Sequence, residues 1–459
     1  MTQITGYGTG QSAQRAPGRD TGHAADTCAS RGQADGGAWH ADGAGHVNAA
    51  RWPDVAMIPD SRARAAVARA LFRRVTARLP VRVVTAVGTT GGGGEGAPRL
   101  LLHRPGDFYR RLGAGGLIGF GESYMAGDWD ADNLPGLLSV FAARMTTLVP
   151  RPAQALRRWY MPRMPAAEDG TPDGARRNIQ RHYDLSNDLF ALFLDETMTY
   201  SAAEFDDLDG SLSPPLAEAK EDSLAKAQRR KVDRILDLAA VGPGSRVLEI
   251  GTGWGELAIR AARRGARVDS ITLSQEQREL ARGRAARAGV AGRVSINLRD
   301  YRDATGSYDA IVSVEMIEAV GDTYWPVFFA TLDRLLAPGG RIGLQAITMA
   351  HDRMLATRNS YTWIHKYIFP GGVIPSARAI EREATRASLR VTARRAFGPH
   401  YARTLQLWRA RFCQHASEVD ALGFDAVFRR MWTLYLAYSE AGFRSGYLNV
   451  QQFALEHAP

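Results

Sequence analysis

Two carboxylates interrupt an apolar run in the stretch VSVEMIEAVG, residues 312–321. Glu315 follows the apolar segment IVSV, and Glu318 comes three residues later with apolar neighbours on both sides. A carboxylate in apolar surroundings costs free energy unless it is paired or used in chemistry. Both positions are therefore candidates for acid–base or charge-stabilising work, and the spacing alone leaves open which of them performs it.

A glycine-rich turn in RVLEIGTGWGELA, residues 246–258, is the candidate ligand loop. Its glycines would let the backbone pass close to a ligand where a strand ends and a helix begins. The absence of GK[ST] excludes a P-loop, and the third glycine follows the second too closely for a dinucleotide fingerprint. An acidic residue just before the glycines makes the loop look like the S-adenosylmethionine loop of Rossmann-like methyltransferases. The candidate cofactor residues of this loop are Glu249, Gly251, Gly253, Trp254 and Gly255.

Polar side chains also follow the next two strand-like segments. Thr272 and Gln277 in ITLSQEQ are placed to hydrogen-bond a ribose, and Asp300 in LRDYRD is placed to accept from an adenine amino group. Tyr301, beside Asp300, is assigned to the same cofactor. Ligand contacts gather at the carboxyl ends of the strands in an open α/β sheet, so these positions predict one continuous cofactor site.

The elements that must position these residues alternate between helical stretches and short apolar strands. Alternation of this kind predicts a doubly wound parallel sheet, and we expect residues 176–459 to form this domain. The strand-like runs are 246–250, 267–273, 293–298, 308–314 and 340–347.

The N-terminal part of the chain has a different character. We expect residues 1–49, which have almost no large apolar residues, to be a disordered tail, and residues 50–148 to form a small α+β accessory domain. Within that domain, the runs 81–87 and 99–104 predict a β-hairpin around a glycine-rich tip. A proline- and arginine-rich linker is predicted at 149–175.

The segment SRARAAVARALFRRVTARL, residues 61–79, predicts a helix with one apolar stripe and many arginines. The stripe consists of Val67, Leu71, Val75 and Leu79. Two interpretations stay open: the helix docks on the small domain through this stripe, or its basic face attracts anionic lipid head groups.

The composition of the chain limits the classes of partner that we expect the protein to bind. The 459 residues carry a net charge of +10, which favours an anionic partner such as a phospholipid surface or nucleic acid. No N/D-P-P-Y/F motif follows the fourth strand, and neither Cys28 nor Cys413 is placed to act as a base-methylating nucleophile, so we expect no nucleic acid partner. Two cysteines also exclude a cysteine-based metal site, and no metal is expected. Without a secretory signal or an eighteen-residue apolar run, the chain is expected in the cytoplasm, peripheral to the inner face of the membrane.

Longer motifs carry a more specific resemblance. NIQRHYDLSNDLFALFLDETMTYSAAEF, EMIEAVG, WIHKYIFPGGVIPS, PHYARTLQLWRARF and AGFRSGYLNVQQF follow one another between residues 178 and 453. They are similar to the catalytic domain of the cyclopropane-fatty-acyl-phospholipid and mycolic-acid cyclopropane synthases, and FGESYMAGDW resembles the accessory domain of the phospholipid-acting members. EMIEAVG and LQAITM point to the branch of oleoyl-phospholipid C-methyltransferases that make 10-methylene stearoyl chains, the precursor of tuberculostearic acid.

The resemblance implies a Rossmann-like class I methyltransferase domain with a mostly parallel seven-stranded sheet. It implies S-adenosylmethionine as the cofactor and the cis double bond of a phospholipid-bound oleoyl-like chain as the substrate. Methylation leaves a carbocation, and loss of a proton then gives an exocyclic methylene or, as the alternative, a cyclopropane ring. Tyr183, Tyr200 and Ser201 resemble family residues that close over the cofactor.

In this family the resemblance also implies a bound bicarbonate as the base, held by a cysteine, a glutamate, a histidine, an isoleucine amide and a tyrosine. The matching positions are Glu318, Ile347 and Tyr401. Two positions depart: Ala202 stands at the cysteine position and Gln345 at the histidine position. Gln345 can still donate from its amide, whereas Ala202 offers no side-chain donor. A water or Glu318 is therefore the alternative to bicarbonate as the base.

The resemblance further implies a homodimer, and a methylene product would need a separate downstream reductase to become a methyl branch. Glu315 has no matched role, and we expect it either to face the cofactor or to hydrogen-bond the glycine loop. A non-catalytic lipid- or cofactor-binding protein is the more distant alternative. Stabilisation by S-adenosylhomocysteine would distinguish the enzyme from that alternative.

Overall fold

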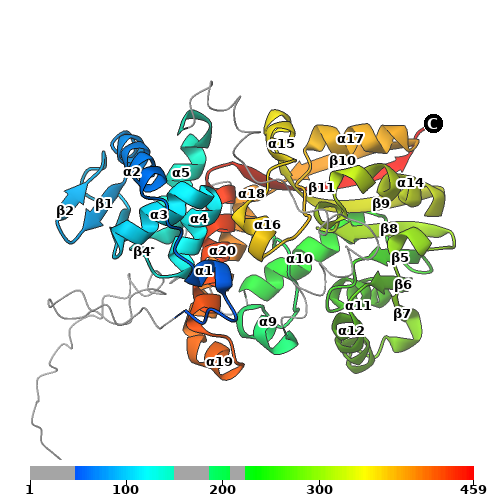
Figure 1. The fold of residues 1–459 in the computed structure, drawn as a ribbon. Coiled ribbons are helices and arrows are strands. Elements are labelled where there is room, and N and C mark those ends of the chain that lie inside the picture. Colours follow the sequence, from blue (N-terminus) through cyan, green and yellow to red (C-terminus); the bar gives the residue numbers. More distant parts are fainter. Residues whose placement is uncertain (1–46, 149–185, 207–222) are drawn as a thin grey trace, which may run out of the picture.

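The computed structural model describes residues 47–148, 186–206 and 223–459. Two sheets lie on opposite sides of a helical layer, with the smaller one built from the N-terminal residues (Figure 1). Most of the predicted tail, the linker at 149–175 and Tyr183 lie outside the described residues.

The small sheet has the strand order β2-β1-β3-β4. Its strands are β1 (Arg82–Thr85), β2 (Gly88–Thr90), β3 (Arg99–Leu102) and β4 (Trp129–Ala131), and its helices are α1 (Pro53–Ala56), α2 (Arg62–Thr76), α3 (Pro105–Gly115), α4 (Leu117–Met125) and α5 (Leu134–Leu148). The predicted hairpin is wrong in its pairing. The start of the glycine-rich segment forms β2, which pairs antiparallel with β1, so β3 pairs with β1 in parallel.

The large sheet has seven strands in the order β10-β11-β9-β8-β5-β6-β7. Its five parallel strands are β5 (Arg246–Ile250), β6 (Arg267–Thr272), β7 (Val294–Leu298), β8 (Tyr308–Val314) and β9 (Leu336–Met349), and the antiparallel pair is β10 (Leu389–Ala396) and β11 (Leu448–His457). This confirms the mostly parallel, Rossmann-like α/β fold. The pair at the edge, β10 and β11, was not predicted.

Helices and short 3-10 turns connect these strands. They are α9 (Asn187–Phe193), α10 (Ser223–Leu238), α11 (Glu256–Arg263), α12 (Gln275–Arg287), η3 (Ala291–Arg293), η4 (Tyr301–Asp303), α13 (Ile317–Val320), η5 (Asp322–Tyr324), α14 (Trp325–Leu335), α15 (His351–Thr357), α16 (Trp363–Tyr367), α17 (Ala377–Arg386), α18 (Gly398–Gln414), α19 (Ala416–Ala421) and α20 (Ala426–Arg444). Side-chain caps start several of them where the site needs a defined end. Ser274, for example, accepts from the Gln277 backbone N–H and so begins α12 directly after β6.

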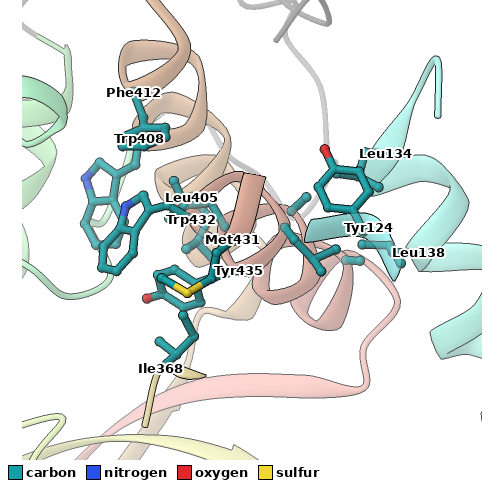
Figure 2. Packing of buried hydrophobic residues seen from close by; sticks show 14 of the residues in the cluster. Tyr124, Leu134, Leu138, Ile368, Leu405, Trp408, Phe412, Met431, Trp432 and Tyr435 are labelled. Carbon is teal, nitrogen blue, oxygen red and sulfur yellow. The ribbon is translucent and has the colours of Figure 1, made fainter. Parts of the chain in front are cut away.

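Helix α20 joins the two parts of the molecule. Figure 2 shows Met431, Trp432 and Tyr435 of α20 beside Trp408 of α18, with Tyr124 of the accessory domain on the other side. All of these belong to one buried apolar cluster that runs through both parts. Burial of large aromatic side chains is the main favourable term in such packing, so this cluster holds the N-terminal part of the chain against the part that contains the large sheet.

Helix α2 does not dock through the predicted stripe. Val67 and Leu71 are 60% and 59% exposed, while Phe72 packs edge-on against Phe108 and Tyr109 of α3. The stripe prediction is wrong at Val67 and Leu71 because the aromatic Phe72 faces the core instead, which turns these two positions outward. Along the described residues no helix is long and apolar enough to cross a bilayer.

Candidate active site

The glycine loop follows β5 at the carboxyl edge of the large sheet. Gly251, Gly253 and Gly255 have φ angles of 96°, 51° and 90°, in the left-handed region where side chains are strained. A Cβ added to Gly251 would lie 2.6 Å from Met316 Cγ. The residue directly after Glu315 therefore packs on the first glycine, which brings the carboxylate stretch beside the predicted cofactor loop.

Glu249 is buried beneath this loop. Its Oε2 accepts from Ser270 Oγ at 2.5 Å, and the Ser270 hydroxyl also pairs with that of Thr252 at 2.7 Å. Burial raises the pKa of Glu249 to about 8, against the opposing effects of Ser270 and the Lys231 charge. In this structure Glu249 ties β5 and the loop to β6.

The candidate ribose residues come together at the end of β6. Thr272 Oγ1 donates to Gln277 Oε1 at 3.0 Å and accepts from the Ser274 backbone N–H. The pair therefore lies one strand away from the glycine loop. The structure places both residues where a ligand at the sheet edge would meet them.

Asp300 is not a free acceptor. Arg302 donates to both of its carboxylate oxygens, from Nε at 2.8 Å and from Nη2 at 2.6 Å. Arg302 was missed because its pairing with a residue only two positions away leaves no pattern in the sequence.

The neighbouring Tyr301 hydroxyl is buried without a hydrogen-bond partner among the described residues, and burial raises its pKa to about 12. An adenine or ribose group could satisfy this hydroxyl.

Trp254 lies within the glycine loop, and its ring and that of Tyr200 both pack against Phe190. Trp254 Nε1 donates to Asn187 Oδ1 at 2.7 Å, which ties the loop to α9. The Tyr200 hydroxyl pairs with that of Tyr435 at 2.6 Å, and its ring stacks on Trp408. These aromatic contacts make the surroundings of the loop apolar and well ordered.

Ser201 contacts a buried lysine, Lys231, that was not predicted from the sequence. Lys231 Nζ donates to Ser201 Oγ at 2.6 Å, and Gln228 Nε2 donates to the Ser201 carbonyl at 2.8 Å. Burial lowers the pKa of Lys231 to about 8, although Glu315 and other acids oppose the shift. A signal was available: apolar positions of α10 recur at helical spacing, and Gln228 and Lys231 fall on the same buried face.

Glu318 contacts the amide assigned to it by resemblance. The Ile347 backbone N–H donates to Glu318 Oε1, whereas Glu318 Oε2 is buried with no partner among the described residues. Burial and then the nearby Glu315 charge raise the pKa of Glu318 to about 8. Near neutral pH this carboxyl group is therefore largely protonated.

Glu315 is the centre of the arrangement, whereas the resemblance assigned Tyr401 and Gln345, together with Glu318, to a bound bicarbonate. The Tyr401 hydroxyl donates to Glu315 Oε2 at 2.7 Å, and Gln345 Nε2 donates to Oε1 at 2.8 Å. The Ala202 backbone N–H also donates to Oε1, at 3.1 Å. The expected hydrogen bond from Glu315 to the glycine loop is wrong, because the carboxylate turns toward these three donors.

Three separate segments place these donors. Gln345 lies in β9, where it pairs in register with Val314 of β8. Tyr401 lies in the first turn of α18, whose start is tied to β11 by the bond from the Gly398 backbone N–H to Asn449 Oδ1 at 2.9 Å. Such long-range convergence favours a rigid carboxylate site, because β9 fixes Gln345 and α18 fixes Tyr401, while Ala202 lies in the irregular segment before α10.

Comparisons with known proteins show the family to which the chain belongs. The family model for mycolic acid cyclopropane synthetase matches residues 171–453. Tuberculostearic acid methyltransferase UfaA1 of Mycobacterium tuberculosis is 55% identical over 414 residues, which cover 89% of this chain and 96% of that protein. Cyclopropane-fatty-acyl-phospholipid synthase of Escherichia coli (strain K12) is 34% identical over 351 residues, 76% of this chain and 85% of that protein.

Two solved methyltransferase-fold structures are similar to this chain. Mycolic acid cyclopropane synthase CmaA1, solved with SAH and CTAB, is 32% identical with a TM-score of 0.54, and the match covers 61% of this chain and 97% of that chain. Coclaurine N-methyltransferase has a TM-score of 0.56 at 17% identity, covering 74% of this chain and 99% of that chain. The second likeness supports the class I methyltransferase fold alone.

Proposed function

Because the chain belongs to the mycolic acid cyclopropane synthetase family and is an S-adenosylmethionine-dependent methyltransferase, we propose that it methylates the cis double bond of an oleoyl-like chain in a phospholipid. The observation that carries this proposal is the position of Glu315, which lies next to the residue that packs on the glycine loop and is bonded by the buried Tyr401, with Glu318 close enough to Glu315 for their charges to interact. Tyr401, which bonds Glu315, packs against Phe443 with ring centroids 4.5 Å apart.

This arrangement suits the chemistry of an alkene. An alkene is a weak nucleophile, so it must be held close to the methyl group in apolar surroundings. Transfer of the methyl group forms one carbon–carbon bond and leaves a positive charge on the chain. Aromatic faces and nearby carboxylates stabilise such a cation.

The proposed product is a 10-methylene chain. After methylation a hydride shifts to the neighbouring carbon, and a proton then leaves the new methyl group, whose C–H electron pair forms the exocyclic double bond. A cyclopropane ring is the alternative product from the same cation. The similarity to a tuberculostearic acid methyltransferase favours the methylene product, with a reductase completing the methyl branch.

The outward face of α2 is proposed as the contact with the membrane, at its cytoplasmic side. Arg62, Arg64, Arg69, Arg73, Arg74 and Arg78 are all exposed. Within the described residues none of these arginines forms an ion pair, and Arg64 and Arg74 lie three or seven positions from the exposed Val67 and Leu71, on the same side of the helix. A surface that combines basic and apolar side chains fits the head groups and upper chains of anionic lipids. A homodimer stays a prediction.

The test is mass spectrometry of lipids from a host that expresses the chain and is supplied with oleate and methyl-labelled methionine. A labelled methylene-branched C19 chain in phospholipids is the expected result. A labelled cyclopropane chain would establish the alternative product, and no labelled chain in a host that accumulates folded protein would reject the proposed function.

A further inference from the structure

Glu315 stands in an unusual backbone conformation. Its φ angle is 52°, in the left-handed region that disfavours residues with a Cβ. Holding a non-glycine residue there costs on the order of 1–3 kcal/mol, and such strain persists only where the surrounding structure imposes it. In this backbone conformation the carboxylate of Glu315 faces Tyr401, Gln345 and the Ala202 amide.

These donors stand at positions to which the family resemblance assigns an external anion. Tyr401 and Gln345 match the tyrosine and histidine positions of the bicarbonate cage, and Ala202 matches the cysteine position. Here all three donate to Glu315, while the Ile347 amide of the same cage donates to Glu318. A bicarbonate would find its donors engaged and would add a charge next to two protein carboxyl groups. The residues present therefore do not fit a bound bicarbonate.

We propose that the side chain of Glu315 replaces bicarbonate as the catalytic base and removes the proton from the methylated chain. This inference rests on the proposed function. A carboxylate offers about four lone-pair positions, and three are used by the donors, so one remains for a proton. The three bonds hold the group still, which fixes the direction from which it attacks the substrate.

The step balances without another reactant. S-adenosylmethionine gives its methyl group to the alkene and leaves as S-adenosylhomocysteine. A hydride then moves from the methylated carbon to the neighbouring cationic carbon, which places the positive charge on the carbon that bears the new methyl group. This cation loses a proton from the new methyl group, and the C–H electron pair becomes the exocyclic double bond. Glu315 takes this proton on a carboxylate oxygen and releases it to water when the product leaves.

Glu315 and Glu318 form a pair of carboxyl groups, and the surrounding groups stabilise the negative charge on Glu315. Glu315 accepts from three donors on other residues and has the Lys231 ammonium nearby, whereas Glu318 accepts from the Ile347 amide and its own backbone amide and is opposed by the Glu315 charge. Two adjacent carboxyl groups titrate as a coupled pair. The negative charge stays on the member that has more hydrogen-bond donors. Glu318 is thus the neutral member and Glu315 the base.

The first experiment compares the wild type with Glu315→Gln in buffer freed of carbon dioxide, using oleoyl-phospholipid vesicles and S-adenosylmethionine. The amide keeps the size of the side chain but cannot take the proton, so turnover should fall by at least about 100-fold. Stabilisation by S-adenosylhomocysteine, measured as a shift in Tm, should remain and shows that the variant is folded. Wild-type turnover should be unchanged when carbon dioxide is removed.

The second experiment uses Glu315→Gly, which relieves the backbone strain and opens the carboxylate position. Turnover of this variant should be restored in part by added bicarbonate or formate, neither of which should stimulate the wild type. Wild-type dependence on bicarbonate, near-normal turnover of Glu315→Gln, or failure of both anions to rescue a variant that binds S-adenosylhomocysteine would overturn the proposal. A wild type that makes no lipid product under any condition would instead count against the proposed function.

Discussion

The hydroxyl of Tyr401 donates to Glu315 Oε2 at 2.7 Å, and this bond links α18 to the loop that follows β8. The bond favours the charged carboxylate and so lowers the pKa of Glu315, while burial raises that pKa overall. Tyr401 therefore influences the pH range in which Glu315 is ionised.

The variant Tyr401→Phe should shift the acidic limb of the pH–rate profile to higher pH. A hydrogen bond to a charged group contributes roughly 1.5–3 kcal/mol, which corresponds to a displacement of about 1–2 pH units. The profile of kcat with oleoyl-phospholipid vesicles measures this displacement. Tyr109→Phe is the control, because Tyr109 packs against the rings of Phe72 and Phe108 in the accessory domain. An unmoved limb in Tyr401→Phe would show that Glu315 does not govern the profile.

The buried carboxyl group of Glu318 should make the protein less stable as pH rises. Its pKa is about 8 in the folded chain and 4.5 in the unfolded reference, so the folded state binds the proton more tightly. The stabilisation is complete below about pH 4.5 and is lost as pH increases through about 8. Glu318→Gln, which keeps an acceptor for the Ile347 amide, removes this contribution.

Urea unfolding between about pH 5 and pH 8 measures this effect. The free energy of unfolding should fall less steeply with pH in Glu318→Gln than in the wild type. Glu381→Gln serves as the control because its side chain is 45% exposed and lies on α17. Equal slopes in the wild type and Glu318→Gln would contradict the assigned protonation.

Apolar runs in the sequence predicted the central strands well. The segments RVLEI and YDAIVSV are β5 and β8 with the expected bounds, because strands buried on both faces read as continuous apolar runs. The antiparallel strands β10 and β11 escaped prediction because neither reads as a continuous apolar run. β10 reads LRVTARRA and is mostly exposed, and β11 carries adjacent glutamines, Gln451 and Gln452, in its middle.

In the candidate site, too, the sequence predicted some features and not others. Local motifs located the glycine loop and both carboxylates. The partner of each carboxylate depends on the positive φ of Glu315 and on side chains from segments far apart in the chain. Neither feature leaves a local pattern, so the role of Glu315 could only come from the three-dimensional structure.

The contact between the two parts of the chain depends on a glycine in α4. A Cβ added to Gly121 would lie 2.3 Å from Trp363 Cδ1 in α16, and this indole is buried. Gly121→Ala should lower the free energy of unfolding by about 1–3 kcal/mol, since the tryptophan or the helix must move.

Gly106→Ala is the matched control for this substitution. Gly106 also lies in a helix, α3, but a Cβ there would meet no atom within 4 Å. This variant should be as stable as the wild type or more stable by up to about 1 kcal/mol. Denaturant unfolding of both variants checks the pair, and equal effects would mean that the α4–α16 contact is not tightly packed.

The exposed arginines of α2 should determine binding to anionic vesicles. Each basic residue near such a surface contributes about 1 kcal/mol, so Arg64→Ala combined with Arg74→Ala, which removes the two arginines beside Val67 and Leu71, should weaken binding by roughly 30-fold. Arg390→Ala combined with Arg394→Ala removes the same charge from β10, where both arginines are exposed and paired with Glu456 and Glu381. Because the change in net charge is identical, the comparison separates a local contact from general attraction. Vesicle co-sedimentation at increasing salt measures both doubles, and equal weakening would mean that α2 is not the docking face.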